Sequence, residues 1–109
     1  MITYDLKDFS VTPFGRYKTD SPFSAEAFRE ILISKLNEAI EQEDVVTIIL
    51  DNVYGLGSSF LEESFGGLVR KGYFTKEQLL SSSPRLLNFE TEHNFYLEEI
   101  EEYINTART

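Results

Sequence analysis

Hydrophobic residues recur at helical spacing between residues 24 and 42. The apolar positions fall on one face of a helix: Phe28, Ile31, Leu32, Leu36, Ala39 and Ile40. The opposite face carries polar residues: Arg29, Glu30, Asn37, Glu38 and Glu41. Ser24 precedes this pattern, and its hydroxyl can cap a helix N-terminus. The pattern therefore predicts a helix over residues 24–42 whose apolar face packs on a sheet.

The next segment, residues 45–51, is an almost uninterrupted apolar run rich in β-branched side chains. Such a run is typical of a strand that is covered on both faces. Residues 2–11 alternate loosely and predict a strand or a short hairpin, and residues 85–91 predict a further strand. Because helical patterns separate residues 45–51 from residues 85–91, we expect these two strands to be parallel, with a right-handed crossover.

Three more helices follow from the pattern. One begins near Ser59 and ends at Arg70-Lys71-Gly72, where basic residues and then a glycine favour a C-terminus. A capping box at residues 75–78 starts a short helix, and a last helix begins near Asn94. Strands and helices thus alternate along a chain of single-domain length. We predict one α/β domain over residues 1–109, with a single mixed sheet and helices mainly on one face.

The loop after residue 51 and the start of the next helix hold the first candidate site. Its expected partner-contact residues are Tyr54, Leu56, Gly57 and Phe60. Ser58 and Ser59 lie where the helix begins. The run Ser59-Phe60-Leu61-Glu62 is a capping box, which predicts a structural N-cap at Ser59. The alternative is a regulated hydroxyl, because a phosphate suits the positive N-terminal end of a helix.

Three charged residues are further candidates for structural or ligand contacts: Arg16, Asp51 and Glu63. Asp51 ends a strand and is expected to accept hydrogen bonds in a loop, with cation binding beside Glu62 or Glu63 as the alternative. Glu63 is expected to point inward or to brace a loop. Arg16 can pair with Asp51 or Glu63, or bind a phosphate of a ligand.

Composition excludes several functions. The chain has no cysteine, which rules out disulfides and thiolate metal sites. A net charge of −9 disfavours nucleic acids and anionic membranes as partners. There is no apolar run long enough to span a bilayer and no signal-peptide pattern, so a cytoplasmic protein is expected. We find no nucleophile–base pair, metal-ligand cluster or phosphate-binding glycine motif, and therefore expect neither catalysis nor a cofactor or metal.

Two stretches resemble a known family. The order of an apolar strand, Asp51, a short loop and Ser58-Ser59 at a helix start resembles the STAS domain of anti-sigma factor antagonists. The chain is more similar to the bacterial family of STAS-like domains of unknown function. That resemblance rests on Thr12-Pro13-Phe14-Gly15-Arg16-Tyr17 through Phe28-Arg29, and on Ser58-Ser59-Phe60-Leu61-Glu62-Glu63-Ser64-Phe65-Gly66.

The resemblance implies a STAS-like fold and a regulatory module that binds a protein. In the antagonists, a histidine-kinase-like ATPase phosphorylates a serine at this helix start, and the matching residue here is Ser59, with Ser58 beside it. This chain has Gly57 and Phe60 where the antagonist pattern Asp-Ser-Ser-Gly has aspartate and glycine. The implied partner is such an ATPase or a domain that it controls. The alternative function is a sensor of a small ligand or nucleotide, since related STAS domains can hold ligands near this loop.

Overall fold

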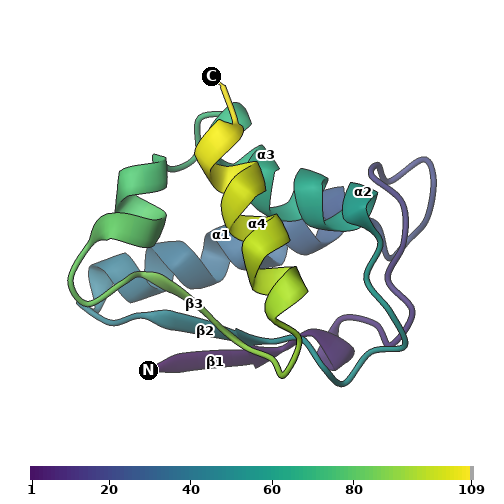
Figure 1. Cartoon of the computed structure of the whole chain (residues 1–109), viewed down its shortest axis with the longest axis horizontal. Helices are drawn as coiled ribbons and strands as arrows, with labels where there is room; N and C mark the ends of the chain where they lie inside the picture. Colours follow the sequence, from purple (N-terminus) through teal and green to yellow (C-terminus); the bar gives the residue numbers. More distant parts are fainter. Residues whose placement is uncertain (109) are drawn as a thin grey trace.

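The computed structural model describes residues 1–108 and contains one sheet of three strands (Figure 1). The strands are β1 (Ile2–Asp5), β2 (Val46–Ile49) and β3 (Leu87–Glu90), in the order β1-β2-β3. Both neighbouring pairs are parallel, which confirms the pairing expected for the second and third strands. The sheet was expected to be mixed, and this expectation is wrong: all three strands are parallel. A helical crossover returns the chain to the same end of the sheet before each new strand.

Helices cover only one face of this sheet, as Figure 1 shows, with α1 (Ala25–Glu41) running along the direction of the strands. Val46 and Ile48 are fully buried beneath the helices, whereas Thr47 and Ile49 point to the other face and are half-buried. The expected helices on one face are confirmed. The expectation that β2 is covered on both faces is wrong, because its side chains alternate between the helix layer and solvent.

The helix predicted over residues 24–42 is confirmed as α1. Ser24 is its N-cap, and its Oγ accepts a hydrogen bond from the backbone N–H of Ala27 at 3.3 Å. Two positions differ from the predicted faces. Ile40 is 46% exposed, because the last turn of α1 borders a hollow of about 360 Å³ that Pro84 and Leu86 also line. Arg29, predicted on the polar face, is only 5% exposed.

The helix predicted from Ser59 begins at Ser58 and continues through three pieces. These are α2 (Ser58–Leu61), a π-helical turn (Glu62–Gly66) and α3 (Gly67–Arg70). The C-terminal signal is confirmed, since Arg70 ends α3 and Gly72 follows with a positive φ of 78°. The short 3₁₀ helix Leu6–Asp8 follows β1, so the early strand does not continue into a hairpin.

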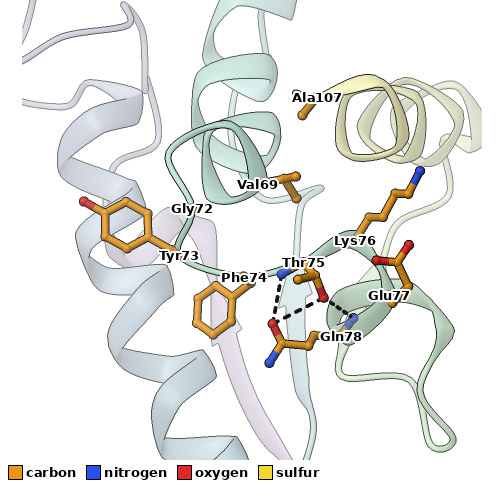
Figure 2. Close-up of a pocket in the computed structure, with 9 residues that line it drawn as sticks. All are labelled: Val69, Gly72, Tyr73, Phe74, Thr75, Lys76, Glu77, Gln78 and Ala107. Carbon is orange, nitrogen blue, oxygen red and sulfur yellow. Dashed lines mark hydrogen bonds between the residues drawn. The ribbon is translucent and has the colours of Figure 1, made fainter. Parts of the chain in front are cut away.

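Two further helical elements complete the chain. A π-helical turn (Glu77–Ser81) follows the predicted capping box, which is confirmed: Thr75 N–H donates to Gln78 Oε1 at 2.9 Å, and Gln78 N–H donates to Thr75 Oγ1 at 3.1 Å (Figure 2). The last helix is α4 (Asn94–Thr106), which buries Ile100 and Ile104. Within residues 1–108, no helix has the length and apolar character needed to cross a membrane.

Candidate functional site

The loop between β2 and α2 presents one large aromatic side chain to solvent. Tyr54 is 88% exposed, and its backbone N–H donates to the carbonyl of Val11 at 2.9 Å. Leu56 is half-buried against the core, and Gly57 is exposed. Phe60 is only 1% exposed and stacks on Phe28 with ring centroids 5.9 Å apart. The prediction that Phe60 contacts a partner is therefore wrong, while the other three residues lie in the predicted loop.

A second loop, between β1 and α1, adds exposed apolar side chains to the same end of the sheet. We define the strand-end surface as four exposed residues of these loops: Val11, Phe14, Phe23 and Tyr54. Backbone hydrogen bonds hold these residues in pairs, because Tyr54 binds Val11 and the N–H of Phe14 donates to the carbonyl of Phe23 at 3.2 Å. The surface lies beyond the carboxyl ends of β1 and β2, where parallel α/β sheets commonly bind ligands.

Ser58 and Ser59 open α2 beside this surface, and both are exposed. The N-cap of α2 is Gly57, which has extended backbone angles of −74° and 152°, and no side chain caps the helix. The predicted capping role of Ser59 is therefore wrong. Ser59 is the second residue of α2 and therefore lies inside the first turn, where its hydroxyl is not in the N-cap position.

A cluster of charges joins the loop between β1 and α1, helix α1, the π-helical turn Glu62–Gly66 and α3. We define the Arg–Glu cluster as three arginines and two glutamates: Arg16, Arg29, Arg70, Glu62 and Glu63. Glu63 is 2% exposed and lies at its centre. Arg29 Nη1 donates to both the Oε2 and the backbone carbonyl of Glu63 at 2.7 Å. Arg70 and Arg16 reach the other carboxylate oxygen of Glu63, at 3.1 Å and 3.4 Å.

Adjacent glycines make room for this cluster. A Cβ at Gly67 would lie 2.6 Å from Arg29 Nη1, closer than real contacts allow. A Cβ at Gly66 would lie 2.8 Å from Glu62 Oε2 and 3.3 Å from the carbonyl oxygen of Tyr103 on α4. These two glycines therefore let the guanidinium of Arg29, the carboxylate of Glu62 and the backbone of α4 approach the helix closely.

The environment of Glu63 favours its charged form. Burial raises the pKa of this carboxyl, but the hydrogen bond from Arg29 and the charges of Arg70 and Arg29 outweigh that effect, with a smaller contribution from Arg16. The net result is a pKa lower than usual for glutamate. The inward, loop-bracing role predicted for Glu63 is confirmed, as is its predicted ion pair with Arg16.

Asp51 lies apart from this cluster. Its carboxylate accepts from Thr91 Oγ1 at 2.5 Å and from the backbone N–H of Glu92 at 2.6 Å. Burial raises the pKa of Asp51, but these two hydrogen bonds and the nearby His93 together lower it by more, so the net shift is downward. The predicted loop-acceptor role is confirmed, and the proposed pairing of Arg16 with Asp51 gives way to pairs with Glu62 and Glu63. Across residues 1–108, no group of three acidic, histidine or cysteine side chains could hold a metal ion.

Sequence reasoning missed the contributions of Arg29, Arg70 and Glu62 to one cluster. The sequence does contain a signal that Arg29 is buried. It follows Ala25 by four residues and precedes Leu32 by three, and therefore falls within the apolar stripe of α1. A basic residue in such a stripe needs a buried acidic partner. Its partner, Glu63, lies 34 residues further along the chain.

Comparison with protein families matches residues 24–82 to the family described as STAS-like domain of unknown function (DUF4325). The matched segment includes α1, β2, α2 and α3, and with them four of the five members of the Arg–Glu cluster. Comparisons with curated proteins and with solved structures gave no match. The matched segment is more than half of the 109 residues, and the chain therefore belongs to the family of STAS-like domains of unknown function.

Proposed function

We propose that this domain is a non-catalytic regulatory module that binds another protein through the strand-end surface. The exposure of Tyr54 carries the proposal, because a large aromatic side chain gains little by facing water in an isolated domain. Tyrosine is also frequent among the residues that dominate binding energy at protein interfaces. The exposed Val11, Phe14 and Phe23 extend the apolar area around such an anchor.

The family resemblance and the charge of the chain support a proposal for the partner. A histidine-kinase-like ATPase, or a domain that it controls, is the partner that the resemblance implies. The net charge of −9 favours a basic surface on that partner, which accelerates association by electrostatic attraction. Ser59, with Ser58 as its neighbour, is the proposed regulatory hydroxyl. A phosphate on either serine would place about two negative charges beside the strand-end surface.

The Tyr54→Ala variant is expected to lose at least tenfold in affinity for the partner while its melting temperature stays unchanged. Truncating an interface anchor typically costs about 2 kcal/mol or more, which exceeds a tenfold change in Kd. The side chain is exposed, so its loss leaves the core intact. Purified histidine-kinase-like ATPases encoded by the same genome provide the candidate partners, and calorimetry measures the Kd.

Tyr73→Ala is the matched control for that experiment. Tyr73 is 51% exposed, against 88% for Tyr54, and it follows α3 and points away from Thr75 and Gln78 (Figure 2). It should bind the partner with the wild-type Kd. Wild-type affinity of the Tyr54 variant would contradict the proposed surface. Equal weakening of both variants would contradict it too, since it would indicate a nonspecific effect of removing a tyrosine.

Ser59→Ala and Ser59→Asp are expected to fold with wild-type stability but to differ in partner binding. Neither change removes a cap, because Gly57 supplies the N-cap of α2. Ser24→Ala is the control for a true cap and should lose about 0.5–2 kcal/mol in denaturant unfolding. If Ser59 is the switch, the aspartate variant loses the ATPase partner and the alanine variant keeps it. Full binding by Ser59→Asp would argue against regulation at this residue.

A further inference from the structure

A polar hollow of about 330 Å³ opens beside the Arg–Glu cluster, between the β1–α1 loop and α3. Its lining residues are Arg16, Tyr17, Glu62, Glu63, Arg70 and Lys71. This hollow is distinct from the strand-end surface, because the two share none of their residues. Arg16 and Arg70 each remain about one-third exposed, so a molecule in the hollow can reach both guanidinium groups.

The hollow concentrates positive charge in an otherwise acidic chain. The Arg–Glu cluster contains three positive and two negative groups, and the exposed Lys71 adds another positive group at the rim. The neighbouring Lys18 is engaged elsewhere, because its ammonium pairs with Glu30 at 2.5 Å. The side chains that line the hollow thus carry three positive charges and two negative ones, whereas the whole chain has a net charge of −9.

Glu62 shows how an oxyanion fits between the two exposed arginines. Its Oε1 accepts from Arg16 Nη1 at 2.5 Å, and its Oε2 accepts from Arg70 Nη1. A single carboxylate therefore spans two guanidinium groups on different elements. Unlike Glu63, Glu62 is partly exposed, so another anion can compete with it for the same donors.

We infer that the hollow binds the phosphate group of a small phosphate monoester, which displaces the Glu62 carboxylate from Arg16 and Arg70. A phosphate monoester carries close to two negative charges at neutral pH. Once Glu62 is displaced, Arg16, Arg70 and Lys71 face only the carboxylate of Glu63, and this surplus of two positive charges matches the phosphate. Guanidinium groups bind its oxygens bidentately, and Lys71 supplies a third cation. The half-exposed ring of Tyr17 forms part of the wall against which the rest of the molecule can lie.

This inference is tested by titrating the full chain with ribose 5-phosphate while backbone amide signals are followed by NMR at constant ionic strength. Ribose is the control without phosphate. We expect saturable shifts with ribose 5-phosphate and none with ribose. The Glu62→Gln variant should bind more tightly by severalfold, because it lacks the competing carboxylate. The Lys71→Gln variant should bind roughly tenfold more weakly, since it loses one charge-assisted contact.

Lys76→Gln is the matched control, because Lys76 lines a separate hollow of about 380 Å³ (Figure 2). It should bind ribose 5-phosphate like the wild type. Absence of saturable shifts in both the wild type and Glu62→Gln would overturn the inference. Equal weakening by the two lysine variants would overturn it as well, since it would indicate only general charge attraction. The titration needs no protein partner, so its outcome is independent of the proposed protein-binding function.

Discussion

Ile48→Asp is expected to abolish cooperative folding. Ile48 is fully buried in the central strand, where it lies between Tyr4 of β1 and Phe89 of β3 in the register of the sheet. An aspartate there would have to bury a charge without a partner or be protonated, at a cost of several kcal/mol. The total stability of a domain is only about 5–15 kcal/mol. Thermal melting followed by circular dichroism should therefore show no sigmoidal transition.

Thr47→Asp is the matched control, since it introduces the same charge one position earlier in the same strand. Thr47 points to the open face and lies between Thr3 and Asn88, so the new carboxylate remains hydrated. This variant should melt cooperatively, with a modest loss of stability. A cooperative, wild-type-like melt of Ile48→Asp would contradict the assignment of the helix-covered face.

The sequence identifies those elements whose signals are local. Periodic apolar residues and a serine cap locate α1, and a run of β-branched side chains locates β2. A reciprocal pair of hydrogen bonds between Thr75 and Gln78 was predictable because both partners lie within one turn. In each case the residues that form the element are close together in the sequence, so the local sequence pattern is enough to predict it.

The N-cap of α2 lies at Gly57, two residues before the predicted Ser59, because the buried core, rather than the serines, sets the register of the helix. Phe60 and Leu61 are both almost fully buried and must already be helical to reach the core together. The N–H of Leu61 consequently bonds to the carbonyl of Gly57 at 3.1 Å, which makes Gly57 the N-cap. A local capping motif does not reveal the position of this N-cap, because tertiary packing determines which of two neighbouring residues begins the helix.

The candidate site was predictable only in parts. Arg16 and Glu63 could each be recognised as a charge in need of a partner, yet the contacts that join them connect residues 47 positions apart. Arg29 was assigned to the solvent face because a charged residue usually marks that face. Its burial follows from Glu63, whose carboxylate and carbonyl both accept from it, and from Gly67, which leaves space for the guanidinium.

Glu63→Gln is expected to destabilise the domain by about 3–5 kcal/mol, because it leaves Arg29 buried without a negative partner. Urea unfolding at neutral pH measures the loss. Glu62→Gln is the matched control. This neighbouring carboxylate pairs with two of the three arginines that Glu63 contacts, but it is partly exposed, and such pairs typically contribute about 0–1 kcal/mol. Equal losses for the two variants would contradict the central role of Glu63 in the buried pair.

The pH dependence of the Glu63→Gln effect distinguishes lost charge from disturbed packing. The folded state lowers the pKa of Glu63 below its value in the unfolded chain, which is about 4.3 for a typical glutamate. The stabilisation from the ionised carboxylate is therefore complete above the unfolded-state pKa and is lost as the pH falls through the folded-state pKa. The difference in unfolding free energy between wild type and variant should be constant from pH 7 to about pH 5.5 and shrink below about pH 4.3. A difference that persists undiminished at pH 3 would show that the glutamine disturbs packing rather than removes a charge.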